Sequence, residues 1–151
     1  RIGLNGQEFN LYKFRTMMQN KDADNLQATK GDTRITKIGS FLRKSSMDEL
    51  PQFYNVFMGD MSVVGPRPHM LKHTQEYSKI IRKYMVRQLV KPGITGAAQV
   101  RGYRGETKDL KDMEGRVRND VWYIENWSIA LDMNLIALTV WSIFKRDEKA
   151  Y

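Results

Sequence analysis

Four stretches of the chain repeat apolar residues at the spacing of one helix face, which predicts four helices. The first follows Ser46 and ends at Gly59-Asp60, and the second covers residues 74–90, with a basic face opposite its apolar face. The third begins near Thr107, and the fourth runs from Ile129 to Phe144 after a capping Ser128. Their apolar positions are Leu50, Phe53, Tyr54 and Phe57 in the first, Tyr77, Ile80, Ile81, Tyr84 and Met85 in the second, and Leu110, Met113, Val117, Val121 and Ile124 in the third.

The N-terminal residues follow a strand pattern instead. Asn5-Gly6 favours a tight turn, so Arg1–Leu4 and the aromatic-rich run Gln7–Phe14 are predicted to pair as a β-hairpin. Along an extended backbone Lys13 and Arg15 share one face. The predicted fold class is therefore α+β, mostly helical with a small N-terminal β-hairpin, and its length fits a single domain over residues 1–151.

The composition is basic, with 25 Lys and Arg against 17 Asp and Glu and a formal net charge of +8. No acidic residue occurs between Glu76 and Glu106, which indicates an anionic partner near that segment. A non-catalytic membrane-surface domain and a nucleic-acid-binding domain both stay open as alternatives to an enzyme, although the sequence has no helix-turn-helix, finger or RNP pattern. Cysteine is absent, which excludes disulfide scaffolds, thiolate metal sites and cysteine nucleophiles.

The start of the chain bears on domain organisation. It begins at Arg1 rather than at Met, and it has no run of about 18 apolar residues that would predict a spanning helix. We therefore expect a domain that is truncated at its N-terminus, with any membrane anchor upstream.

The acidic pair Asp48-Glu49 follows Arg43 and Lys44 at a predicted helix start. Backbone N–H groups and nearby cations attract phosphate and keep a carboxylate ionised, and an ionised Asp can attack phosphorus. The alternative is structural, because Ser46 and Glu49 also have the spacing of a capping box.

Three further features allow both a functional and a structural interpretation. Arg67 stands between two prolines, where it could bind phosphate or belong to a rigid surface turn. Asp120 lies at the edge of an apolar stripe, so it is a candidate metal ligand or the i,i+4 partner of Arg116. His69 and His73, with Glu76, have chelating spacing, but no H-E-x-x-H occurs.

Two other patterns stay open in the same way. Asp22-Ala23-Asp24 matches a D-x-D metal-binding pattern, and the alternative is a solvated loop or helix. Trp122, Trp127 and Trp141 gather near the C-terminus with Tyr123 and Phe144, beside Lys145 and Arg146. This mixture is typical of a helix in a membrane interface, although ordinary core tryptophans are the alternative.

Six runs follow one another along nearly the whole chain: Lys13–Met17, Thr33–Gly39, Leu42-Arg43, Asp48–Gln52, Gly59–Pro68 and Val90–Gly96. Together they resemble one family, the bacterial sugar transferases, also called monotopic phosphoglycosyl transferases. The segment Gln99–Thr107 and the tail ending in Ala150-Tyr151 are most similar to the subgroup of undecaprenyl-phosphate glucose phosphotransferases that start exopolysaccharides of the colanic-acid type. Ala98 departs from the family, many of whose members have Trp there.

The resemblance implies a catalytic domain of a monotopic membrane enzyme with amphipathic interfacial helices, on the cytoplasmic face of the bacterial inner membrane. It implies transfer of hexose-1-phosphate from a UDP-hexose, UDP-glucose in this subgroup, to undecaprenyl phosphate, with release of UMP. This transfer is the first membrane step of exopolysaccharide, capsule or O-antigen synthesis. The expected partners are the two substrates and anionic lipid headgroups, with self-association left open and no nucleic acid.

The resemblance also implies roles for individual residues. Asp48 matches the family's covalent nucleophile, and Glu49 would hold Mg²⁺ or assist proton handling. Asp48, Glu49 and Asp120 form the implied magnesium set. The implied substrate-binding cations are Lys13, Arg15, Arg43 and Arg67.

Overall fold

The computed structural model describes residues 1–19, 29, 31–103 and 109–144. Its helices over these residues are α1 (Lys37–Lys44), α2 (Gln52–Phe57), α3 (Leu71–Tyr77), α4 (Leu110–Glu125) and α5 (Ile129–Phe144). Short helical turns lie before α1 at η1 (Leu4–Gly6) and between the helices at η2 (Met47–Glu49), η3 (Tyr84–Leu89) and η4 (Gln99–Tyr103). The strands are β1 (Ser62–Val64) and β2 (Gly93–Thr95).

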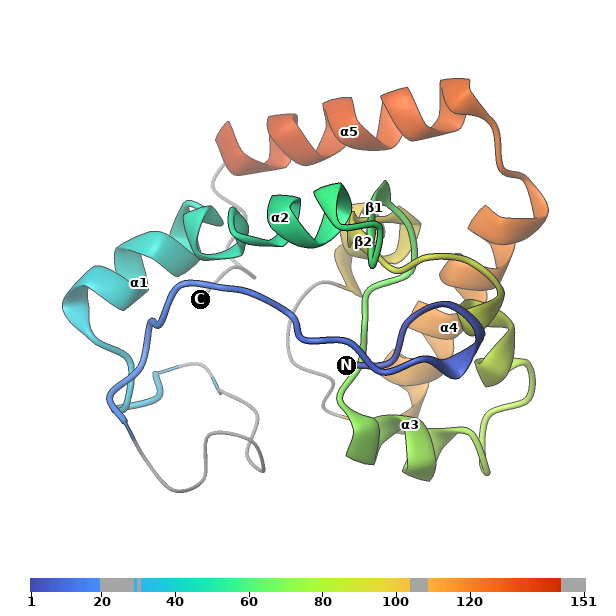
Figure 1. Cartoon of the computed structure of the whole chain (residues 1–151), viewed down its shortest axis with the longest axis horizontal. Coiled ribbons are helices and arrows are strands. Elements are labelled where there is room, and N and C mark those ends of the chain that lie inside the picture. Colours follow the sequence, from blue (N-terminus) through green and yellow to red (C-terminus); the bar gives the residue numbers. More distant parts are fainter. Residues whose placement is uncertain (20–28, 30, 104–108, 145–151) are drawn as a thin grey trace.

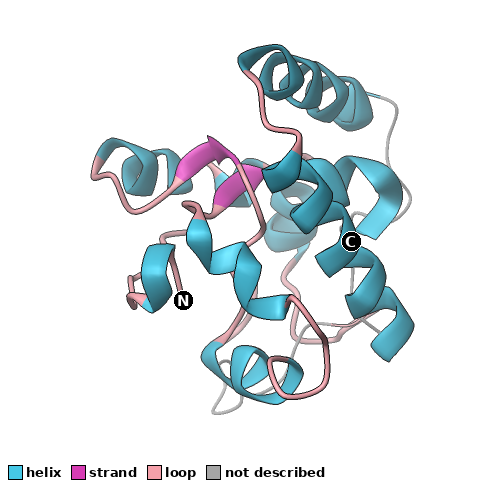
Figure 2. Cartoon of the chain, turned by 90° about the vertical axis from the view of Figure 1, so that its right-hand side faces the viewer, coloured by secondary structure: helices cyan, strands magenta, loops and turns pink. Residues whose placement is uncertain are grey.

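The two strands form a small parallel sheet in which Ser62 lies opposite Gly93 and Val64 opposite Thr95. Figure 2 shows the strands side by side among the helices. The two backbones approach so closely that a Cβ atom on Gly93 would lie 2.1 Å from the backbone nitrogen of Gly65. This sheet fixes the start of the turn that carries Arg67.

Two clusters of buried apolar side chains form the core, and α4 contributes to both. In the first cluster, Met113, Val117 and Val121 of α4 pack against Ile81 and Tyr84. In the second cluster, side chains of α4, β1 and α5 meet. That cluster contains Val64, Ala97, Tyr123 and Leu135. The predicted stripe of the third helix is thus confirmed at its three central positions.

The N-terminal segment begins with η1 beside η3 and then runs past α2 toward α1 (Figure 1). The backbone N–H of Tyr12 donates to Oδ1 of Asn55 at 3.0 Å. The N–H of Phe14 donates to the carbonyl of Asp48 at 3.0 Å. The segment is therefore attached to α2 and to η2 on either side of Lys13.

The predicted hairpin forms only close to its turn at Asn5-Gly6. Ile2 and Glu8 make an antiparallel bridge, and the N–H of Phe9 donates to the carbonyl of Arg1 at 2.9 Å. Beyond Phe9 the predicted strand is not paired with Arg1–Leu4, because the N–H groups of Tyr12 and Phe14 bond to α2 and η2 instead.

The predicted helix over residues 74–90 is also wrong as one element. α3 ends at Tyr77, Lys83 has a left-handed backbone with φ 66°, and η3 follows as a 3₁₀ helix. In a 3₁₀ helix residues i and i+3 share a face, so both Tyr84 and Arg87 point into the protein.

The fourth helix is confirmed from Ile129 to Phe144, and Ser128 Oγ accepts from the N–H of Leu131 at 3.1 Å. The third helix begins at Leu110, where the Asp109 side chain caps it. The capping box at Ser46 does not form, because Ser46 has a left-handed backbone with φ 58° and its side chain accepts no capping bond. Over the described residues no helix has the length and apolar content to cross a membrane.

Candidate active site

Asp48 lies in η2, the turn that joins α1 to α2, and only 9% of its surface is exposed. The charged groups that act on its carboxyl are Glu49, Lys13, Arg43 and Arg67. Two adjacent carboxylates and three cations from separate parts of the chain therefore meet at one place. These are five of the seven residues that the sequence assigned to the site.

Arg43 comes from the last turn of α1, and its guanidinium is oriented by Thr16. Arg43 Nε donates to Thr16 Oγ1 at 2.9 Å, and Thr16 is buried. Gly39 permits this approach, because a Cβ atom there would lie 1.9 Å from the carbonyl oxygen of Thr16. The N-terminal segment thus crosses α1 at a glycine and holds Arg43 toward the acidic pair.

Arg67 forms the closest charged contact of the site. Its Nη2 lies 2.6 Å from Oε1 of Glu49, and its Nη1 lies 3.5 Å from Oε2. The negative charge of Glu49 raises the pKa of Arg67, so the guanidinium stays charged. Glu49 therefore holds Arg67 beside Asp48.

Burial and the neighbouring charges raise the pKa of Asp48 and lower the pKa of Lys13. Burial raises the pKa of Asp48, and the neighbouring charge of Glu49 raises it further, while Lys13, Arg43 and Arg67 act against this. Lys13 is exposed as a whole residue, yet desolvation of its ammonium and repulsion from Arg43 lower its pKa. A buried carboxylate among cations is the environment expected of a reactive acid.

Arg15, which is exposed, and Asp120, which lies in α4, are not among the charged groups named above that act on Asp48. Asp120 is 1% exposed within α4, and its Oδ2 accepts from Arg87 Nε at 2.7 Å. In the described part of the chain no three His, Asp or Glu side chains are placed to hold a metal ion. In the described residues Asp120 is therefore not brought together with Asp48 and Glu49 as a three-carboxylate set.

The surroundings of Asp120 also correct two sequence interpretations. Its hydrogen-bonding partner is Arg87 rather than Arg116 four residues before it, although Arg116 acts on it electrostatically. His69 is buried, precedes α3, and its Nδ1 lies 2.6 Å from the hydroxyl of Tyr84. His69 is thus part of the core, and the i,i+4 helical spacing assumed for a chelate does not apply to it because it precedes α3.

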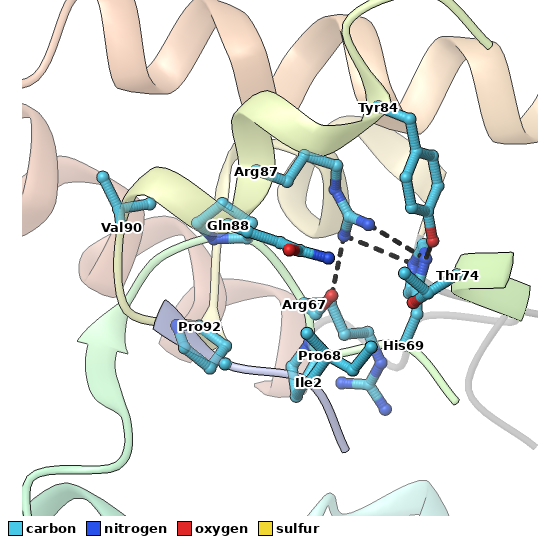
Figure 3. A pocket seen from close by; sticks show the side chains of 12 residues that line it. Ile2, Arg67, Pro68, His69, Thr74, Tyr84, Arg87, Gln88, Val90 and Pro92 are labelled. Carbon is cyan, nitrogen blue, oxygen red and sulfur yellow. Dashed lines mark hydrogen bonds between the residues drawn. The ribbon is translucent and has the colours of Figure 1, made fainter. Parts of the chain in front are cut away.

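A small cavity of about 20 Å³ lies in this region, and Arg87, His69 and Tyr84 are among the residues that line it. A volume of this size holds about one water molecule. Figure 3 shows these three side chains close together. The guanidinium of Arg67 points away from Arg87 in this view.

Three residues that organise the site were missed by sequence reasoning. Thr16 orients Arg43, and Arg87 binds the backbone of the Arg67 turn. Asn55 is fully buried, and its amide bonds to Tyr12 N–H and to the carbonyl of Asn10. An Asn among the apolar residues of a predicted helix is the one feature that could have pointed to such a bond.

Apolar side chains lie exposed on the two helices that flank the dyad. The predicted stripe of α2 faces outward, with Phe57 85% exposed, and Ile38 of α1 is 74% exposed. Trp127 and Trp141 are also exposed, which excludes the core alternative for these two tryptophans, while Trp122 packs against the second cluster. Asp22 to Asp24, Lys145 and Arg146 lie outside the described residues.

Comparison with known proteins gives one consistent result. The model of the family described as bacterial sugar transferase matches residues 1–146. The chain is 53% identical over 146 residues to the UDP-glucose:undecaprenyl-phosphate glucose-1-phosphate transferase of Klebsiella pneumoniae, covering 95% of this chain and 31% of that protein.

Two further relatives have the same name. The protein from Xanthomonas campestris pv. campestris is 55% identical over 141 residues, which are 92% of this chain and 29% of that protein. The protein from Escherichia coli is 50% identical over 145 residues, which are 95% of this chain and 31% of that protein. The chain spans about a third of the length of these three relatives.

Proposed function

Because the chain belongs to the bacterial sugar transferase family, we propose that it moves glucose-1-phosphate from UDP-glucose to undecaprenyl phosphate and releases UMP. The names of the three relatives support the donor and the acceptor. The observation that carries the proposal is the buried Asp48 carboxyl, on which Glu49 and three cations act together.

Asp48 acts as the nucleophile in this scheme. One carboxylate oxygen forms a bond to the phosphorus that bears the sugar, and the bond from that phosphorus to the bridging oxygen breaks, so UMP leaves with the electron pair. An oxygen of the polyprenyl phosphate then displaces Asp48 from phosphorus and regenerates the carboxylate. Two in-line displacements of this kind place the transferred phosphate on the lipid.

The cations of the site bind and neutralise the phosphates. Lys13, Arg43 and Arg67 approach Asp48 from three different segments, so charge on either side of the reacting phosphorus can be stabilised. The structure holds these groups in place before substrate binds, since Thr16 bonds Arg43 and Glu49 bonds Arg67. Such preorganisation is the main contribution a protein makes to phosphoryl transfer.

We propose Asp48 and Glu49 as the residues that would hold Mg²⁺. Mg²⁺ prefers oxygen ligands and is commonly bound by one or two carboxylates together with substrate phosphates. The dyad fits this pattern, because two adjacent carboxylates repel each other and the charge of Glu49 raises the pKa of Asp48. Bound Mg²⁺ would offset phosphate charge during the transfer.

We propose further that the exposed apolar faces of α1 and α2 lie on the cytoplasmic surface of the inner membrane. Ile38, Phe41, Phe53 and Phe57 are each more than half exposed, and they lie on the helices that flank Asp48. A phosphate at the end of a lipid chain is located at the membrane interface, so this orientation brings the acceptor to the dyad. A nucleic-acid-binding role gains no support from the family match.

The experiment that tests the function is a search for the covalent intermediate. The complete protein, solubilised in detergent with Mg²⁺, is incubated with UDP-glucose in the absence of lipid acceptor and measured by intact-protein mass spectrometry. We expect a mass gain of one hexose phosphate, located on Asp48 and removed by undecaprenyl phosphate. UMP release without any adduct, in rapid-quench samples, would argue against the covalent route.

The raised pKa of Asp48 predicts an acid limb in the pH profile. Because the carboxylate is the nucleophile, kcat/KM for UMP release should fall as pH drops through a midpoint above the usual Asp pKa of 3.8. Glu49→Gln removes one of the charges that raise this pKa, so the midpoint should move to lower pH even if the rate is low. A midpoint that stays constant or rises in Glu49→Gln would contradict this electrostatic account.

A further inference from the structure

We infer that Asp120 and Arg87 are positioning residues that hold the backbone of the Arg67 turn, so that the Arg67 guanidinium is presented to Glu49 and Asp48. This inference rests on the proposed function for its catalytic consequence. The positioning link is the pair of hydrogen bonds that Arg87 makes to Asp120 and to the Arg67 carbonyl, and it can be tested without measuring enzyme turnover.

The link begins with a buried ion pair. Arg87 Nε lies 2.7 Å from Asp120 Oδ2, and the two side chains are 6% and 2% exposed. The residues are 33 positions apart, on η3 and α4. Since an uncompensated charge in such a position is costly, each side chain keeps the other in place.

The second step joins this pair to the turn. Arg87 Nη2 donates to the backbone carbonyl oxygen of Arg67 at 2.7 Å (Figure 3). Two residues later, His69 bonds the hydroxyl of Tyr84, which gives the same turn a second anchor on η3. The turn is therefore fixed to η3 on one side, while the Arg67 side chain extends to the other.

The third step reaches the dyad. Arg67 Nη2 lies 2.6 Å from Glu49 Oε1, and Arg67 acts electrostatically on Asp48. One continuous chain of contacts thus runs from Asp120 through Arg87 and the Arg67 carbonyl to Glu49. Asp120 touches none of the reacting groups, so its effect on the reaction passes through the position of Arg67.

The test is a double-mutant cycle in the complete protein. Lys at position 87 keeps the charge beside Asp120 but cannot reach both Asp120 and the Arg67 carbonyl as the planar guanidinium does. We expect Arg87→Lys to lower kcat for UMP release by roughly 10- to 100-fold, with KM for UDP-glucose changed by less than about threefold. In an Arg67→Ala background the same substitution should change kcat by less than about twofold, because the guanidinium to be positioned is gone.

A purely structural role gives a different outcome. If Arg87→Lys lowers kcat by the same factor in both backgrounds, the positioning role is wrong. Asp120→Asn serves as the second variant, since it keeps the shape of the side chain and should give the same non-additive pattern. The matched control is Lys83→Gln, which removes the exposed pair of Lys83 with Glu125, 3.4 Å apart, between the η3 region and α4. We expect no change in kcat for this control.

Amide hydrogen exchange separates the two proposals. Exchange in the peptide spanning residues 62–70 should accelerate in Arg87→Lys and Asp120→Asn but not in Lys83→Gln. If the wild-type protein releases no UMP while this exchange pattern holds, the proposed function fails and the positioning link stands. Unchanged exchange in both variants overturns the link whatever the activity shows.

Discussion

Asp48→Asn is expected to lower UMP release from UDP-glucose by a factor on the order of 10⁴ or more, because an amide cannot form the bond to phosphorus. The substitution changes one oxygen to nitrogen and preserves the shape of the side chain. The adduct seen by mass spectrometry should disappear together with turnover. The measurement is UMP production by the complete protein with both substrates and Mg²⁺.

Stability should move in the opposite direction to activity. The folded protein raises the pKa of Asp48, so above the ordinary Asp pKa the folded state is destabilised by ionising this group, and stability increases as pH falls through the raised pKa. A neutral Asn removes this cost, and thermal stability near pH 7 should be equal to or higher than that of the wild type. Loss of activity could then not be attributed to unfolding.

The matched control is Asp109→Asn at the start of α4. The Asp109 side chain accepts from the N–H of Asp112 at 2.9 Å, and Asn caps a helix about as well as Asp. This variant makes the same chemical change away from the dyad and should retain full turnover. Normal UMP release by Asp48→Asn would refute the assignment of Asp48 as nucleophile.

Much of the site was predictable because its residues carry their own local pattern. The dyad follows a basic helix end, and Arg67 is fixed between prolines, so both are recognisable in the sequence alone. The six sequence runs that resemble the family added Lys13 and Arg43 to the predicted site. In the structure the other four side chains all act electrostatically on Asp48, while the catalytic roles of the five residues stay predictions.

What the sequence could not reveal depends on distant contacts. Asp120 pairs with Arg87, 33 residues away, whereas spacing rules compare only neighbours on one helix. Lys83 takes a left-handed backbone without a glycine or proline to mark the break in the second helix. Periodicity located the stripe of α2 but could not show that it faces outward, since a core face and a membrane face have the same spacing.

A second large effect is expected from a substitution in the small sheet that precedes the Arg67 turn. Gly93→Ala should destabilise the 151-residue chain by about 3 kcal/mol, because the added Cβ would lie 2.1 Å from the Gly65 nitrogen and 2.6 Å from its Cα. Backbone atoms cannot move aside as a flexible side chain would. The strands must therefore separate, which weakens the bond from Gly65 N–H to the carbonyl of Thr95, 2.8 Å long.

Thermal unfolding measures this effect, with an expected fall in the midpoint of roughly 6–12 °C for a chain of this size. Gly31→Ala is the control, because nothing lies within 4 Å of a Cβ there and only its φ of +81° is unfavourable, at a cost of about 1 kcal/mol. Equal midpoints for the two variants would show that the strands are not packed as closely as described. Because Gly65 leads directly into Pro66 and Arg67, separation of the strands should also move the guanidinium from Glu49, so Gly93→Ala should lower kcat at temperatures where the protein is still folded.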